Sequence, residues 1–321
     1  MTAVPEAPDA REPEFAAPGT VSPKIAYLLL AIAPLCMASN VVIGRAAADT
    51  VPPVALAFWR WTTATALLMP FALPSLWRYR RVLWAAAPRV LALGLTGMAL
   101  SASFVYTGVS HTTAANAGLI YAISPVLIIL IGVVFRGEKV SWQQIAGIVL
   151  AIAGVVVIVT RGDPTYLLDL QINPGDLWVV GAALCWAIYS VLLREGSVPV
   201  PTLPMFAITA LAGVICLAPA YAVDTWISAP VDWTREAIAS VAGVAVIASV
   251  LAFGLYQIGI RSVGPARAGV FNYLIPVYAV ALGVMLLGET LAVFHGLGLA
   301  LILPGLLLAG LRRSTRPAKP L

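Results

Sequence analysis

Residues Ala114–Glu138 read AANAGLIYAISPVLIILIGVVFRGE, and this stretch decides the fold of the chain. It is an apolar run long enough to cross a bilayer core of about 30 Å as a helix. Pro125 lies near its middle, and it ends on a Gly-Glu pair. The design returns over Pro265–Glu289 as PARAGVFNYLIPVYAVALGVMLLGE. A helix repeated within one membrane chain predicts two related halves.

The repeat extends beyond this helix. A shift of 151 positions aligns identical residues of the two copies: Ala117 with Ala268, Gly118 with Gly269, Pro125 with Pro276, Val126 with Val277, Gly132 with Gly283, Gly137 with Gly288 and Glu138 with Glu289. A shift of 149 positions aligns earlier residues: Cys36 with Cys185, Ala38 with Ala187, Arg45 with Arg194 and Pro70 with Pro219. We therefore expect a first repeat over 25–160 and a second over 175–312.

The composition predicts an all-α membrane protein. Of the 321 residues, 61% are hydrophobic and 10% are charged, whereas soluble proteins average about 25% charged residues. Ten apolar runs are predicted to form transmembrane helices: 25–47, 53–74, 87–107, 113–135, 141–160, 175–194, 203–222, 236–260, 265–287 and 291–311. None shows the period-two alternation of barrel strands. Five helices per half is an odd number, so the two halves form a 5+5 inverted-topology repeat, which places a site near the membrane midplane.

Lysine and arginine predict the orientation. With a cytoplasmic N-terminus, fifteen of these residues fall in cytoplasmic segments and three in outer segments. We therefore expect both termini in the cytoplasm, including a disordered tail over 1–24 and a short tail over 313–321, in a multi-pass protein of the cytoplasmic membrane. The net charge of +5 reflects this topology signal rather than affinity for nucleic acid.

The sequence lacks the residue patterns that several classes of chemistry require. The three cysteines have no zinc-ligand spacing, and two histidines alone cannot hold a metal. A phosphate-binding glycine loop followed by lysine is absent, so neither ATP hydrolysis nor any cofactor is predicted. No aspartate or glutamate falls at the middle of a predicted span, which favours a facilitator or exchanger over a proton-driven carrier.

At this level of detail the sequence resembles the EamA type of the drug/metabolite transporter superfamily. The resemblance rests on Pro34–Arg45, Phe58–Pro70 and Ala114–Glu138, with the later copies at Ala182–Arg194 and Pro265–Glu289. It implies an exporter of amino acids or other metabolites. It also implies that helices one to four and six to nine line the cavity, with helices five and ten outside. Relatives often carry a tryptophan where this chain has Met37.

Arg60 is the sharpest candidate for substrate binding. It lies about seven residues into the second apolar run, between Trp59 and Trp61. An arginine keeps its charge in any protein environment, so it needs a partner or a cavity. One interpretation is contact with a substrate carboxylate, together with Trp59. The other is an interfacial arginine packed on the flanking indoles.

Asparagines in the spans are the next candidates. Asn40 lies among small residues of the first run, where it contacts either substrate or a neighbouring helix. Asn272 and Tyr273 precede Pro276, which removes a backbone hydrogen bond and can free a carbonyl for a ligand. A simple kink without ligand contact is the alternative.

The remaining binding candidates are mostly aromatic. Trp186 and Tyr189 are three residues apart and share a helix face. Further candidates lie on other predicted lining helices: Tyr106, Tyr121, Tyr256 and Gln257. An aromatic wall suits an amphipathic organic solute, although aromatic residues within spans also serve ordinary packing.

Together these features predict a secondary transporter that moves a small organic solute across the bilayer by alternating access. An amino acid is the favoured solute, with an aromatic or apolar side chain as the preferred subclass. Pro125 and Pro276 are expected to act as hinges, and Glu138 and Glu289 as gates on opposite faces. The alternatives are a channel and a membrane-embedded lipid-modifying enzyme. The sequence leaves open whether the protein is a monomer or a homodimer.

Overall fold

The computed structural model describes residues 21–137, 140–163, 173–194, 198–227, 230–263 and 265–310, and within these ranges the chain is helical without any strand. The first half contains α1 (Pro23–Ala46), α2 (Pro53–Arg78), α3 (Arg80–Ala85), α4 (Ala87–Leu93), the π-helix η1 (Gly94–Leu100), α5 (Ser101–Val109), α6 (Ala114–Tyr121), α7 (Ser124–Arg136) and α8 (Trp142–Val159). The second half contains α10 (Pro174–Arg194), α11 (Thr202–Ile227), α12 (Arg235–Ala245), the π-helix η2 (Val246–Leu251), α13 (Ala252–Val263), α14 (Pro265–Val270), the 3-10 helix η3 (Phe271–Tyr273), α15 (Leu274–Leu287) and α16 (Val293–Gly310).

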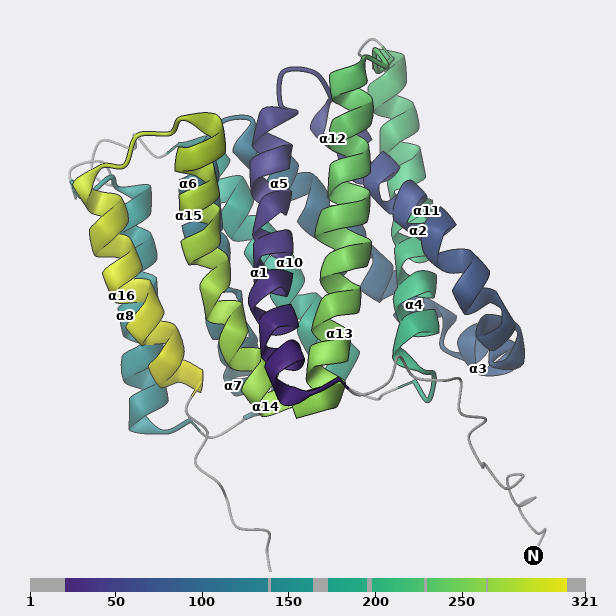
Figure 1. The fold of residues 1–321 in the computed structure, drawn as a ribbon, viewed down its shortest axis with the longest axis horizontal. Helices are drawn as coiled ribbons and strands as arrows, with labels where there is room; N and C mark the ends of the chain where they lie inside the picture. The colour runs from purple at the N-terminus through teal and green to yellow at the C-terminus, as the bar shows by residue number, and fades with distance from the viewer. Residues whose placement is uncertain are drawn as a thin grey trace, which may run out of the picture.

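These helices form one upright bundle (Figure 1). Among the described residues, nine helices or joined helices are long and apolar enough to span a membrane. The tenth predicted span is α2, which has 26 residues. Its hydropathy is lowered by Arg60 and by the threonines that follow it. The prediction of an all-α membrane protein with two repeats and about ten spans is confirmed.

The backbone repeats as the sequence does. The third span of each half contains a π-helical segment, η1 or η2. The fourth span of each half breaks just before its proline. Pro125 lies in the first turn of α7 and Pro276 is the third residue of α15, where the missing N–H costs no hydrogen bond. Both spans end on a left-handed glycine, Gly137 (φ 62°) or Gly288 (φ 65°), a conformation that residues with a Cβ rarely adopt.

The two halves run in opposite directions. We call the end where α1 begins, at the bottom of Figure 1, the proximal end, and the end where it finishes the distal end. A Cβ at Gly108, near the distal end of α5, would lie 2.9 Å from the carbonyl oxygen of Gly175 at the start of α10. Gly97, earlier in the same span, contacts Tyr189, near the end of α10. Since α1 and α5 both run toward the distal end, α10 runs opposite to α1.

The halves interlock instead of lying side by side. From the first half, α1 packs against α12, α13 and α15 of the second half, and we call these helices group A. From the second half, α10 packs against α4, α5, α6 and α7 of the first half, and we call these helices group B. The fifth and tenth spans, α8 and α16, pack against each other at one side of the bundle (Figure 1).

Close backbone contact holds α8 and α16 together, which gives a stability prediction. A Cβ at Gly305 would lie 2.6 Å from the amide nitrogen of Ala151 and 2.8 Å from the carbonyl oxygen of Gly147. We expect Gly305→Leu to separate the helices and lower the unfolding temperature in detergent, because such packing relies on small residues. Gly296→Leu is the matched control, since no atom lies within 4 Å of a Cβ there. Equal unfolding temperatures for the two variants would contradict the prediction.

Candidate functional site

A cavity of about 580 Å³ lies between groups A and B. This volume is within the range of small-molecule sites. Its walls come from the first four and the sixth to ninth spans, and include Met37, Asn40, Arg60, Trp61, Met98, Ser101, Tyr121, Trp186, Tyr189, Phe206, Ser249, Phe253, Tyr256, Gln257 and Asn272. Neither α8 nor α16 contributes to this lining.

Arg60 forms one polar end of the cavity. Its Nε donates to Ser249 Oγ at 2.9 Å, and its Nη1 donates to Asn40 Oδ1 at 2.6 Å and to Tyr106 Oη at 2.9 Å. Tyr106 Oη in turn donates to the same Asn40 oxygen at 2.7 Å. The guanidinium also lies 4.6 Å from the centre of the Trp61 ring. Residues of the first, third and eighth spans, and therefore of both halves of the chain, position this one cation.

The charge of Arg60 is not neutralised by the described chain. The residue is 8% exposed, and all its hydrogen-bond partners are neutral. Within the described ranges Nη2 has no hydrogen-bond acceptor. A buried cation without a counter-ion is expensive in a medium of low dielectric constant. The arrangement favours an anionic ligand that reaches Arg60 from the cavity.

A second polar end is built from neutral groups. Asn272 Nδ2 donates to Tyr256 Oη at 2.9 Å, while Asn272 Oδ1 is buried without a partner among the described residues. Gln257 lines the same region. Tyr256 follows Ser249 by seven residues along η2 and α13, which corresponds to roughly 10 Å of helix. The cavity thus offers a cation at one end and neutral hydrogen-bonding groups at the other.

Aromatic side chains form the wall between these ends. The rings of Trp186 and Tyr189 lie 5.0 Å apart, so the predicted shared face is confirmed. Phe206 and Phe253 stack at 4.0 Å. Tyr121 Oη lies 3.2 Å from Ser101 Oγ, which ties this ring to the third span. Such a wall suits the apolar part of an organic solute.

The structure brings together eight of the eleven residues predicted to bind substrate. The residues that line the cavity are Asn40, Arg60, Tyr121, Trp186, Tyr189, Tyr256, Gln257 and Asn272.

Three other predicted residues lie outside this lining. Tyr106 is buried behind Arg60 and holds it. Trp59 faces the opposite side of α2, where its Nε1 donates to Tyr221 Oη at 3.1 Å. Tyr273 donates to the carbonyl of Leu306 in α16 at 3.1 Å, because η3 turns it away from Asn272.

Sequence reasoning missed several lining residues, of which Ser249 is the most informative. Its hydroxyl holds Arg60, yet in the sequence it is a lone serine in an apolar run. The repeat offered a usable signal for other positions. At a shift of 149 Met37 pairs with Trp186 and Asn40 with Tyr189. All four residues line the cavity, as expected if the pseudo-twofold axis passes through it.

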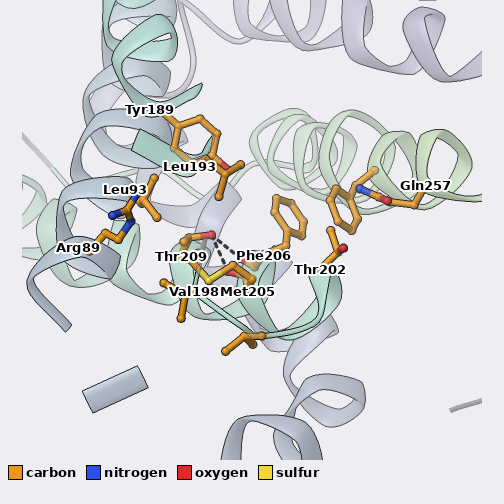
Figure 2. A pocket seen from close by; sticks show the side chains of 12 residues that line it. Arg89, Leu93, Tyr189, Leu193, Val198, Thr202, Met205, Phe206, Thr209 and Gln257 are labelled. Atoms are coloured by element: carbon orange, nitrogen blue, oxygen red, sulfur yellow. Dashed lines mark hydrogen bonds between the residues drawn. The ribbon is translucent and has the colours of Figure 1, made fainter. Parts of the chain in front are cut away.

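A smaller cavity of about 290 Å³ adjoins the main one toward the proximal end. Figure 2 shows the side chains that line it. The two share lining residues, among them Tyr189, Phe206 and Gln257. Arg89 lines the smaller cavity and donates a hydrogen bond to the carbonyl of Leu192 near the end of α10. Thr209 lines it as well, and its hydroxyl bonds back to its own helix.

Polar contacts join groups A and B at the distal end. Glu289, after α15, accepts hydrogen bonds from Ala114 N at 2.6 Å and Ala115 N at 2.9 Å. These are free N–H groups of the first turn of α6, so the carboxylate caps that helix across groups A and B. The predicted gate residue Glu138 lies outside the described residues.

Comparison with known proteins places this architecture in a family. The sequence model of the EamA-like transporter family matches residues 24–160 and 173–311 of this chain. The chain belongs to the EamA-like transporter family. The two matched segments of this EamA-family chain correspond to the two inverted halves of the bundle. It is therefore a multi-pass membrane transporter of a small-molecule solute.

Curated relatives of this EamA-family chain are named as transporters. It is 26% identical to the uncharacterized transporter YyaM of Bacillus subtilis over 80% of its own length and 84% of that protein. It is 28% identical to the uncharacterized inner membrane transporter YedA of Escherichia coli, over 88% of this chain and 89% of that protein. A probable terminal-alkyne amino-acid exporter of Streptantibioticus cattleyicolor is 29% identical, over 70% of this chain and 73% of that protein. A protein whose crystal structure is known shares the fold, with a TM-score of 0.59 and 24% identity. The match covers 90% of this chain and 97% of that protein.

Proposed function

We propose that this transporter carries a small organic carboxylate, an amino acid with an apolar or aromatic side chain being the best fit, by alternating access. The observation that carries the proposal is the buried cation Arg60, which faces the cavity with neutral partners alone among the described residues. A substrate carboxylate would supply the missing negative charge through charge-assisted hydrogen bonds.

The rest of the cavity fits the other parts of such a solute. The aromatic wall around Trp186 and Tyr189 covers an apolar side chain. Asn272 Oδ1, which lacks a partner among the described residues, is an acceptor suited to an ammonium group. The name of the Streptantibioticus relative, an amino-acid exporter, agrees with this solute class and with export as the direction.

Contacts between the two groups at the distal end support alternating access. In this conformation Glu289 joins group A to group B there, while the smaller cavity lies toward the proximal end. The breaks before Pro125 and Pro276 are the hinges at which α6 and α15 would change their tilt. The excess of lysine and arginine supports a cytoplasmic proximal end and an outward-facing distal end.

Transport into proteoliposomes tests the proposal with one matched solute series. The series consists of phenylalanine, its methyl ester and phenethylamine, which retain the ring and differ at the carboxyl group. We expect saturable transport of the acid and at least about tenfold lower kcat/KM for the other two, because neither can neutralise Arg60. Equal transport of all three would overturn the proposal, and flux that never saturates would indicate a channel.

A further inference from the structure

Asp176 is a buried acid that the transport site does not use. It is the third residue of α10 and is 1% exposed, at the distal end where α10 packs against α6 within group B. Thr112 Oγ1 donates to its Oδ1 at 2.6 Å. The other carboxyl oxygen, Oδ2, is buried without any hydrogen-bond partner among the described residues. An ionised carboxylate with one bare oxygen would be costly in this position.

A second orphaned acceptor lies beside it. Asn116 is 5% exposed, and its side chain is within hydrogen-bonding reach of the Asp176 carboxyl. Its Nδ2 donates to Thr112 Oγ1 at 3.3 Å, while its Oδ1 is buried without a partner in the described part of the chain. A proton on Asp176 would remove the negative charge that the bare Oδ2 otherwise carries in this buried position.

Other charged or titratable groups lie at the same end of the bundle as Asp176. Burial of Asp176 favours its neutral form and outweighs the opposing attraction of Arg161, which follows α8. His111 is exposed on the α5–α6 connection, and its carbonyl accepts a hydrogen bond from Asn173 at 2.9 Å. Glu289 holds Ala114 and Ala115 on the same turn of α6 as Asn116. His295, at the start of α16, accepts a hydrogen bond from Ala292 N through Nδ1.

We propose that Asp176 is a proton-binding site that makes opening of the distal end depend on the pH of the distal solution. The inference rests on the alternating access proposed above. While the distal end is closed, Asp176 is neutral. When Glu289 leaves the first turn of α6, water reaches Asn116 and Asp176 from the distal side. An aspartate in water is ionised at neutral pH, so opening releases one proton to that side and closing takes one up.

The site acts as a one-sided switch. At a shift of 149 the position that matches Asp176 in the first half is Tyr27, so the repeat does not provide this carboxyl at the proximal end. The proton returns to the solution from which it came, and no net proton transport is implied. By linkage, each pH unit of distal alkalinisation raises the ratio of distally open to closed protein by up to about tenfold.

The experiment uses the full-length transporter in proteoliposomes. Spin labels on cysteines at His111 and Asp232, two exposed positions in different packing groups, report opening of the distal end after the native cysteines are replaced by alanine. We expect the wild-type open fraction to rise with distal pH. Asp176→Asn is neutral at every pH and should therefore remain closed throughout. Asp49→Asn, an exposed acid at the same end, should respond as wild type does.

Infrared spectroscopy of the same protein gives an independent measurement. The closed wild-type protein should show a protonated carboxylic-acid band that disappears in Asp176→Asn. Absence of that band at neutral pH would overturn the proposal, as would an unchanged pH response in Asp176→Asn, which would assign the titration to His295 or Glu289. Failure of this test with carboxylate transport intact refutes the switch alone, whereas failure of the solute series with the pH response intact refutes the proposed substrate alone.

Discussion

Replacing Arg60 with leucine is expected to abolish the proposed preference of the transporter for a carboxylate. In the wild-type protein the guanidinium is held by Asn40, Tyr106 and Ser249, and Arg60 lines the cavity. Removing one partner of a buried charge pair costs about 2–5 kcal/mol, so affinity for the acid should fall by about 30-fold or more. The measurement is kcat/KM for phenylalanine relative to its methyl ester.

The ratio of the two solutes separates a lost contact from a damaged fold. A poorly folded variant transports both solutes less, whereas loss of the Arg60 contact lowers the ratio specifically. Arg60→Lys should retain part of the preference, because an ammonium keeps the charge but cannot make the same set of hydrogen bonds. Arg78→Leu removes an exposed cation from the same helix and serves as the control. An unchanged ratio in Arg60→Leu would remove Arg60 from the substrate site.

Replacing Glu289 with alanine should open the distal end. The carboxylate accepts two N–H groups of α6 at 2.6 and 2.9 Å and lies against Gly283, where a Cβ would be 2.6 Å from Oε2. Hydrogen bonds to a charged group contribute about 1.5–3 kcal/mol each. With water replacing them in the open state, we expect a net shift of about 2 kcal/mol, or about 30-fold, toward the open form. The spin-label pair at His111 and Asp232 measures it.

Two further variants serve as a control and as a second test of this prediction. Glu236→Ala is the matched control, because it removes an exposed acid from the start of α12 at the same end of the bundle and should leave the equilibrium unchanged. Gly283→Ala should act like Glu289→Ala, because the added methyl group displaces the carboxylate from α6. A closed distal end in both Glu289→Ala and Gly283→Ala would show that the cap does not hold the gate.

The sequence alone determined the spans, the repeat and eight of the residues that line the cavity. Hydrophobicity over about twenty residues specifies a membrane helix with little help from tertiary contacts. An internal repeat of five helices must be inverted, because five is odd. Pro125 and Pro276 therefore lie on corresponding helices that run in opposite directions. Arg60 stood out because a permanent charge in an apolar run demands a partner.

Only the tertiary structure decided which partners these residues meet. Side chains one position apart face different ways, so Arg60 lines the cavity while Trp59 pairs with Tyr221. Ser249 became a partner of Arg60 because the π-helical segment η2 lies against α2. The unpaired oxygens of Asp176 and Asn116 likewise depend on α10 packing against α6. Pattern and hydropathy determine what crosses the membrane, but hydrogen-bond partners depend on the rotation and packing of helices, which no local pattern encodes.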